Sequence, residues 1–406
     1  MKIILILIDG LGDEPIPALG NKTPLEVAET PNLDFMAKNG RCGSVKTFRF
    51  PEENEPTSEG AHIALFGYED NFLGRGAYEA MGIGIKLKKT DVALRVNFAF
   101  VFQEEESGLT IVDRRAGRIE KTQPLIKALS GIKIQGITFL LKKAFGHRAV
   151  LVMRGKGLSK NISDGDSHAE NGLVKNILPL DDSKEAKFTA EVLNQFLAQS
   201  HQILENSVFN KKRGKNGLLP ANFLLIRRAG QIGDIVSFKN KYGLRSGFVA
   251  GGGLYKGMAR ILGMKEIKVK GATGFYNTNL KGKISAVKKN INNFNFIFCH
   301  IKATDTFAHD GDFQGKKDFI EKIDKNLKPL LNLKNTLIVV TGDHSTCSLE
   351  KDHCCLPVPI FVYGEEKDLI NKFSERDCLK GSLGTIKQED FMQIILNYAK
   401  INNNKQ

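Results

Sequence analysis

Short apolar runs that end at polar, glycine-bearing turns recur along the chain. The runs at 3–8, 295–299, 337–341 and 360–363 are apolar or β-branched at almost every position, which is typical of strands covered on both faces of a sheet. Helix-like segments alternate with these strands in the C-terminal part. The pattern predicts an open α/β sheet flanked by helices, and such sheets keep their functional sites at the carboxyl ends of the strands.

Helix signals lie between these runs and in the middle of the chain. Residues 23–40 predict two short helices that break at Pro31, because proline suits the first turn of a helix. An apolar helical run begins at Ser58, and another helix is expected at 186–204. Further strands are expected at 92–102, 109–113 and 149–153.

The strand-rich middle block predicts an inserted domain. It begins after the glycine-rich segment 74–87, where Gly82 and Gly84 are hinge candidates, and the chain returns to the first domain near 246–257. The glycines of 74–87 do not follow a clear strand and open a helix, which excludes a dinucleotide-binding loop. The expected domains are a discontinuous core of 1–84 and 250–406 and an insert of 85–249.

The composition fits a protein with a large core and no membrane segment. Of the 406 residues 41% are apolar, and no run approaches the ~18 apolar residues of a membrane span. The apolar start at 3–8 is too short for a signal peptide and has no cleavage site, so we expect a cytoplasmic protein. The six cysteines form no C-x-x-C pair, and the adjacent Cys354 and Cys355 suit a disulfide framework poorly, so we expect reduced thiols.

The charge does not by itself indicate a nucleic-acid partner. A net charge of +14 suits a polyanion, but the basic residues are scattered along the chain. The densest run, at 211–215, has no interleaved aromatic residues, and we interpret it as a solvated loop. Basic charge also suits a small phosphorylated substrate.

Two Asp–His pairs follow predicted strands. Asp343 and His344 come after one strand, with His353 nine residues later. Asp305 and His309 come after another and, four residues apart, would share one face of a helix. A surface i,i+4 pair would explain Asp305 and His309 alone, but two such pairs at strand ends predict a metal site. Imidazole with carboxylate suits Zn²⁺ or Mn²⁺ better than an all-oxygen Mg²⁺ or Ca²⁺ site.

Two further residues have both a structural and a functional interpretation. Asp9 follows the first predicted strand and would face the same sheet edge, although Asp9–Gly10 also reads as a plain turn. Ser58 lies where a helix would begin, as an N-cap serine does. The same place would favour a serine alkoxide and a phosphate, because first-turn N–H groups attract negative charge. His62, one turn later, suits either the core or support of the site.

Arginines gather in short segments of the predicted insert, which include Arg114, Arg115 and Arg148. Guanidinium groups suit carboxylate and phosphate ligands, although solvated surface charge is an equal alternative. A third segment of the insert adds Asp166 and His168.

Taken together and in order, these motifs resemble the alkaline phosphatase superfamily and, more closely, the archaeal-type cofactor-independent phosphoglycerate mutases. The resemblance spans nearly the whole chain and is carried by DGLGD (9–13), TPLEVAETPNLD (23–34), GRGAYEAMGIG (74–84), DRRAGRI (113–119), HIKATDTFAHDGD (300–312), TGDHST (341–346) and GSLGTIKQEDFM (381–392). The chain departs from the family around Ser58. It reads Thr-Ser-Glu-Gly-Ala-His at 57–62, where the family usually has Gly-Ser-Asp-Thr-Ala-His, and Ser167 stands where a proline is usual.

The resemblance implies an alkaline-phosphatase-like α/β core sheet flanked by helices, with a smaller inserted α/β domain that binds substrate. It also implies two divalent ions, usually Mn or Zn, with Co and Mg as further options, and no need for 2,3-bisphosphoglycerate. One ion would be held by Asp305, His309 and His353, and the other by Asp9, Ser58, Asp343 and His344. Ser58 would be the nucleophile. The residues expected to bind substrate are Arg114, Arg115, Arg148, His168 and Lys256.

The implied activity is the interconversion of 3-phosphoglycerate and 2-phosphoglycerate, a step of glycolysis and gluconeogenesis, through a phosphoserine. The insert would hold the glycerate and exclude water, because water would otherwise take the phosphate. The alternative is a related metal-dependent phosphatase, phosphonate hydrolase or other phosphotransferase; only the charge supports a non-enzymatic binding protein. We expect a small-molecule partner, no nucleic acid and no membrane, and the sequence does not indicate an oligomeric state.

Overall fold

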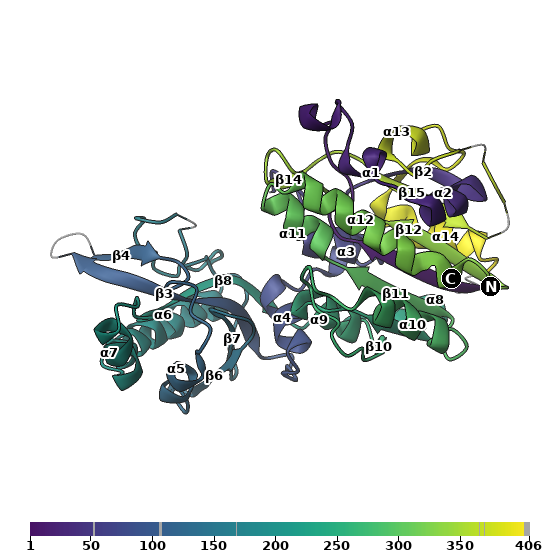
Figure 1. Ribbon diagram of the computed structural model, residues 1–406. Coiled ribbons are helices and arrows are strands. Elements are labelled where there is room, and N and C mark those ends of the chain that lie inside the picture. The colour runs from purple at the N-terminus through teal and green to yellow at the C-terminus, as the bar shows by residue number, and fades with distance from the viewer. Residues whose placement is uncertain (52, 105–107, 168, 365, 369, 402–406) are drawn as a thin grey trace. The chain divides into compact units, whose positions relative to one another are not determined.

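The computed structural model describes residues 1–401 except 52, 105–107, 168, 365 and 369. The chain divides into two compact units (Figure 1). Unit 1 comprises Met1–Phe72 and Val236–Gln406, and unit 2 comprises Leu73–Ile235. Both crossings lie closer to the N-terminus than the expected 84/85 and 249/250.

Unit 1 is built on an eight-stranded sheet with the order β10-β9-β11-β1-β12-β15-β2-β16. The central strand β1 (Lys2–Ile8) pairs in parallel with β11 (Phe296–Ile301) and with β12 (Thr336–Thr341). Within this sheet, β15 (Val358–Tyr363) is the only described strand that runs antiparallel to both of its neighbours. The four strands predicted from apolar runs are thus confirmed. The remaining strands are β2 (Gly40–Lys46), β9 (Ser246–Val249), β10 (Lys265–Glu266), β16 (Gly384–Lys387) and the separate hairpin of β13 (Ser345–Cys347) and β14 (Asp352–Cys354).

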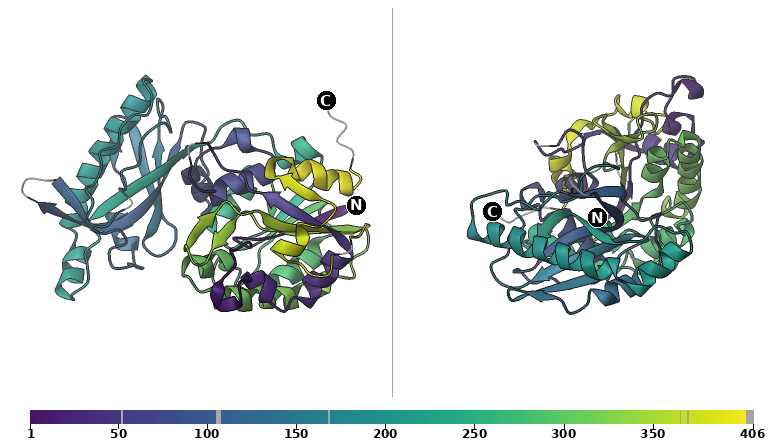
Figure 2. Two further views of the ribbon diagram at one scale, coloured as in Figure 1. Left: turned by 90° about the horizontal axis from the view of Figure 1, so that it is seen from above. Right: turned by 90° about the vertical axis from the view of Figure 1, so that its left-hand side faces the viewer.

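Helices cover both faces of this sheet (Figure 2, left). On one face Ile4, Ile6 and Ile8 pack into a buried cluster with residues of α2 and α12. On the other face Phe298 packs against Phe66, the residue that follows α3, with ring centroids 5.1 Å apart. The predicted helix break is confirmed, because Pro31 begins α2. The helices of unit 1 are α1 (Pro24–Val27), α2 (Pro31–Lys38), α3 (Ser58–Leu65), α8 (Phe238–Tyr242), α9 (Gly253–Ile261), α10 (Leu280–Asn290), α11 (Ala303–His309), α12 (Phe313–Leu327), α13 (Glu375–Cys378) and α14 (Phe391–Tyr398).

Unit 2 is an antiparallel sheet with its own core. The order is β4-β3-β7-β6-β5, and β8 also pairs with β3. Helix α6 packs on this sheet, where Phe196 stacks on Phe139 with ring centroids 4.1 Å apart. The three strands and the long helix predicted here are confirmed. The elements are α4 (Arg75–Gly82), β3 (Val92–Glu104), β4 (Gly108–Asp113), α5 (Gln123–Ala128), β5 (Lys133–Ile134), β6 (Ile137–Lys143), β7 (Arg148–Arg154), α6 (Lys184–Glu205), α7 (Val208–Lys215) and β8 (Phe223–Gln231).

The glycine-rich segment before β3 packs closely against other elements of unit 2. A Cβ on Gly76 would lie 2.1 Å from Ala93 O, and one on Gly74 would lie 2.1 Å from Ala229 O. Glycine therefore lets α4 approach β3 and β8 of unit 2 closely. At the second crossing, β9 pairs with β11 and so belongs to unit 1. A hinge at Gly82 and Gly84 stays a prediction.

Two expectations from the sequence were wrong. Residues 211–215 are helical and form the last five residues of α7. Asn210 anchors this polar helix through bonds from Nδ2 to Leu204 O (2.8 Å) and Ala221 O (3.0 Å). Cys347 and Cys354 form a disulfide, because the β13–β14 hairpin brings them together. No helix among the described residues is long and apolar enough to cross a membrane.

Candidate active site

Neighbouring strands of unit 1 end at one edge of the sheet and deliver the predicted residues there. Asp9 follows β1, Asp305 lies in α11 directly after β11, and Asp343 follows β12. The turn after β1 is tight, because a Cβ on Gly10 (φ +63°) would lie 2.8 Å from Asp305 Cβ. Gly10 N also donates to Asp343 Oδ1 at 3.0 Å. The Asp9–Gly10 turn is therefore itself part of the site.

Asp305, His309 and His353 form the first cluster. Asp305 Oδ1 lies 3.4 Å from His309 Nε2 and 3.5 Å from His353 Nε2. The other nitrogen of each ring bonds a backbone carbonyl: His309 Nδ1 donates to Lys351 O (2.8 Å), and His353 Nδ1 donates to Pro56 O (2.6 Å). In the neutral rings these bonds leave each Nε2 lone pair directed at the carboxylate, as a metal ligand requires.

Asp9, Asp343 and His344 form the second cluster, and all three are fully buried. His344 Nε2 lies 3.2 Å from Asp343 Oδ2, 3.8 Å from Asp9 Oδ1 and 3.2 Å from Ser58 Oγ. Asp9 Oδ1 and Asp343 Oδ2 accept no hydrogen bond from any residue that the structure describes. Buried carboxylate oxygens without a partner are costly, so these residues fit a divalent cation.

Burial and neighbouring charges shift the pKa values of three residues in the clusters. Burial, together with the charge of Asp9, raises the pKa of Asp343 to about 7. Burial lowers the pKa of His344 to about 3. Burial opposes protonation of His353 as well, but the bond and charge of Asp305 raise the pKa of His353 to about 9. A divalent cation would keep the carboxylates ionised and the imidazoles neutral.

Ser58 is the first residue of α3, and its interpretation as an N-cap is wrong. The N-cap is Thr57, whose Oγ1 accepts a hydrogen bond from Gly60 N at 3.3 Å. Ser58 Oγ instead lies beside His344, at the positive end of the helix. His62 Nδ1 donates to Ser58 O at 2.7 Å and so supports the serine within the same helix.

Three residues near Asp9 were not predicted from the sequence. His300 Nε2 donates to Asp9 Oδ2 at 3.0 Å, and Lys302 Nζ lies 3.3 Å from the same oxygen. Tyr255 of α9 stacks on His300, with ring centroids 3.6 Å apart. His300 and Lys302 are two residues apart at a strand end, so they point to the same side. This two-residue spacing was the feature of the sequence that could have identified His300 and Lys302.

The predicted arginines lie in unit 2. Arg114 forms a fork with Asp166, with Nε to Oδ1 at 3.0 Å and Nη2 to Oδ2 at 2.7 Å. Burial lowers the pKa of Arg148 to about 10 and that of Arg227, which the sequence analysis missed, also to about 10. The Nε atoms of Arg148 and Arg227 are buried and donate no hydrogen bond to any described residue. A cluster of this kind suits an anionic ligand.

The other expected substrate residues are distributed more widely. Arg115 is exposed. Lys256 lies on α9 of unit 1, where Nζ pairs with Glu266 Oε1 at 3.2 Å. His168 lies outside the described residues. Their roles in binding substrate stay predictions.

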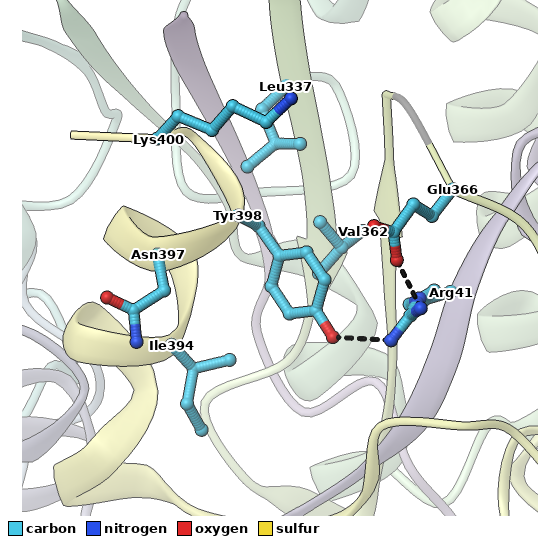
Figure 3. Close-up of a pocket in the computed structure, with 8 residues that line it drawn as sticks. All are labelled: Arg41, Leu337, Val362, Glu366, Ile394, Asn397, Tyr398 and Lys400. Atoms are coloured by element: carbon cyan, nitrogen blue, oxygen red, sulfur yellow. Dashed lines mark hydrogen bonds and ion pairs between the residues drawn. The ribbon is translucent and has the colours of Figure 1, made fainter.

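A cavity of about 420 Å³ lies at the opposite, amino-terminal end of β12 (Figure 3). Leu337 and Val362 contribute apolar surface to it. Arg41 Nη1 donates to Tyr398 Oη at 3.1 Å, and Nη2 pairs with Glu366. Because this guanidinium is already occupied, and the predicted site residues lie at the other edge of the sheet, we place no catalytic site there.

Comparison with known proteins agrees with this arrangement. The chain matches the family model of the metalloenzyme superfamily over residues 1–398. A 2,3-bisphosphoglycerate-independent phosphoglycerate mutase from Archaeoglobus fulgidus is 44% identical over 99% of this chain and 98% of the relative. One from Methanocaldococcus jannaschii is 41% identical over 97% and 96%.

Two solved structures are also similar to the chain. A cofactor-independent phosphoglycerate mutase from Thermoplasma acidophilum has a TM-score of 0.71 and 36% identity, over 98% of this chain and all of the other. A Pyrococcus horikoshii protein has a TM-score of 0.85 and 29% identity, over 100% and 99%. The predicted fold class, a mixed α/β sheet flanked by helices, is confirmed. The chain therefore belongs to the metalloenzyme superfamily and, within it, to the 2,3-bisphosphoglycerate-independent phosphoglycerate mutases.

Proposed function

We propose that the protein interconverts 3-phosphoglycerate and 2-phosphoglycerate without 2,3-bisphosphoglycerate, through a phosphoserine at Ser58. The observation that carries this proposal is the position of Ser58 Oγ, 3.2 Å from His344 Nε2 and at the start of α3. A nucleophile is thereby placed beside the carboxylate–imidazole clusters. Membership of the mutase family supports the same activity.

Each cluster would hold one divalent ion. Ions bound there would neutralise phosphoryl oxygens and lower the pKa of the serine hydroxyl. Carboxylate and imidazole ligands favour Mn²⁺, Zn²⁺ or Co²⁺, with Mg²⁺ as a weaker option. The proposed ligands are Asp305, His309 and His353 for one ion and Asp9, Ser58, Asp343 and His344 for the other.

Ser58 performs both halves of the transfer. Its Oγ attacks the phosphorus of 3-phosphoglycerate, the bond from phosphorus to the 3-oxygen breaks, and that oxygen gains a proton to balance the one lost by the serine. The 2-hydroxyl then attacks the phosphoserine, the Oγ–phosphorus bond breaks, and Oγ recovers a proton. The first-turn N–H groups of α3 favour the negative charge of the phosphoserine. No water and no second phosphate donor are consumed.

The arginines of unit 2 would bind the carboxylate of the glycerate. Arg148 supplies a half-buried guanidinium whose Nε atom is fully buried, and Asp166 fixes the orientation of Arg114. Arg148→Met should raise KM for 3-phosphoglycerate by roughly 10- to 100-fold, since a charge-assisted bond contributes about 1.5–3 kcal/mol. Lys187→Met is the matched control, because Lys187 is an exposed cation of the same unit, paired with Asp182 at 3.0 Å.

An enolase-coupled assay tests the proposal directly. Protein stripped of metal and reloaded with Mn²⁺ should convert 3-phosphoglycerate in the absence of 2,3-bisphosphoglycerate, and chelated protein should not. Phosphate label on the substrate should remain on the glycerate, because the transfer excludes water. Inorganic phosphate as the main product would instead identify a metal-dependent phosphatase.

A further inference from the structure

Lys302 lies between the two clusters. Its Nζ donates to Asp305 Oδ2 at 2.6 Å and to Asp9 Oδ2 at 3.3 Å. The same nitrogen lies 5.5 Å from the ring centroid of Tyr255, which is itself buried and stacked on His300. One ammonium group is therefore bonded to one carboxylate of each cluster.

The two oxygens of Asp305 have different surroundings. Oδ1 lies 3.4 Å from His309 Nε2 and 3.5 Å from His353 Nε2, and it accepts a bond from Thr346 Oγ1 at 2.9 Å. Oδ2 is turned to Lys302 and accepts no hydrogen bond from any other described residue. The oxygen that faces the imidazoles is thus the one that Lys302 does not hold.

The two oxygens of Asp9 also have different surroundings. Its Oδ1 lies 3.8 Å from His344 Nε2 and accepts no hydrogen bond from the described part of the chain. Its Oδ2 accepts bonds from His300 Nε2 at 3.0 Å and from Lys302. In both clusters, Lys302 therefore bonds the carboxylate oxygen other than the one that faces the imidazoles of the cluster itself, which are His309 and His353 for Asp305 and His344 for Asp9.

We propose that Lys302 is a positioning residue that fixes which oxygen of Asp305 and of Asp9 is presented to a metal ion. The inference rests on the proposed function, in which both clusters hold divalent ions. A carboxylate with no partner on its outer oxygen can rotate or coordinate through both oxygens, and a charge-assisted bond prevents both. The Asp305 cluster depends on Lys302 more strongly, because Asp9 Oδ2 keeps its bond from His300 when the ammonium is removed.

A positioning role and simple charge repulsion predict opposite results. An ammonium group repels a divalent cation, so charge alone predicts tighter metal binding when Lys302 is lost. Loss of orientation predicts weaker binding, by the roughly 10- to 100-fold that is typical of groups behind metal ligands. The sign of the change therefore distinguishes the two.

The experiment is a titration of metal-free protein with Mn²⁺, in which free Mn²⁺ is measured by electron paramagnetic resonance. Wild-type protein should bind two ions, and Lys302→Met should weaken one site by roughly 10- to 100-fold while the other changes less. Lys302→Arg keeps a cationic donor and should recover most of the affinity. Lys317→Met makes the same change in net charge on α12, where Lys317 pairs with Glu321 at 2.7 Å, and should bind Mn²⁺ as the wild type does.

Equal or tighter binding by Lys302→Met would overturn the positioning role, and so would equal weakening in Lys317→Met. If the methionine variant does not fold, Lys302→Gln gives the same test, because it removes the charge and shortens the donor. A wild-type protein that binds no Mn²⁺ would overturn the proposed function itself and the inference with it.

Discussion

Replacing Ser58 by alanine should remove activity with little effect on stability. Among the residues that the structure describes, one polar atom lies within hydrogen-bond distance of Ser58 Oγ, His344 Nε2 at 3.2 Å, and one such bond contributes about 1 kcal/mol. Alanine recovers part of this through its helix propensity, about 0.5 kcal/mol better than serine. The free energy of unfolding should therefore change by less than about 1 kcal/mol. Turnover should fall by a factor on the order of 10⁴ to 10⁶, as loss of a nucleophile does.

Thr57→Ala is the matched control, because Thr57 is the residue that caps α3. Its loss should cost about 1 kcal/mol of stability and leave turnover within a few-fold of wild type. Ser58→Ala should thus lower turnover with little change in stability, whereas Thr57→Ala should lower stability with little change in turnover. Urea titration of the metal-free proteins gives the first quantity, and the enolase-coupled assay gives the second.

Mass spectrometry of protein trapped with substrate completes the test. The phosphate should be found on Ser58. A phosphate on Thr57 would move the nucleophile by one residue. A Ser58→Ala protein that keeps a tenth of the wild-type rate would refute the covalent mechanism.

Three further predictions concern other parts of unit 1. Asp343→Ala and His353→Ala should each lower the amount of bound Mn²⁺, measured by elemental analysis, and reduce turnover at least about 100-fold. Their circular dichroism spectra should stay unchanged, and a normal metal content would mean that the two residues are not ligands. Burial raises the pKa of Glu375 to about 7, so the folded state holds this proton more tightly and the free energy of unfolding should fall by roughly 2–3 kcal/mol between pH 5 and pH 8. Glu375→Gln should flatten that fall in urea titrations, and an equal slope would contradict the assignment. Replacing Cys347 and Cys354 by alanine removes a cross-link between residues with a sequence separation of 7 and should lower the free energy of unfolding by about 2 kcal/mol. A thermal midpoint of the wild-type protein that does not change when reductant is added would argue against the disulfide.

The elements of the core could be read from the sequence because burial leaves a simple pattern. Every residue from Ile3 to Ile8 is fully buried, and such a strand shows as an unbroken apolar run. The Asp–His pairs could then be placed, since neighbouring parallel strands end at the same edge. The pattern could not give the orientation of an individual side chain. Whether Ser58 or Thr57 caps α3 depends on the residue at which the helix begins, and the pattern does not fix this position to within one residue.

Residues that act through contacts distant in sequence were missed. His300 lies in an apolar strand and resembles a core residue until β1 is paired beside β11, which brings it to Asp9. Tyr255 reaches His300 only through the packing of α9. The disulfide was missed for a similar reason, since only the β13–β14 hairpin brings Cys347 to Cys354. Local pattern identifies donors and acceptors, but pairing of strands decides which of them meet.

The unusual sequence at 57–62 can be explained by the packing around Gly60. A Cβ at this position would lie 2.9 Å from Phe50 Cε2 and 3.0 Å from Thr57 Oγ1. The Phe50 ring has little room to move, because its centroid lies 5.0 Å from that of Phe48 and 4.8 Å from that of Phe72. The threonine that the family usually has at position 60 would therefore need a different residue at position 50. The space left by Phe50 and Thr57 therefore limits which residue fits at position 60. Ser58 and Gly60 are two residues apart on α3 and so do not share a face of the helix, and Ser58 Oγ lies 3.2 Å from His344 Nε2.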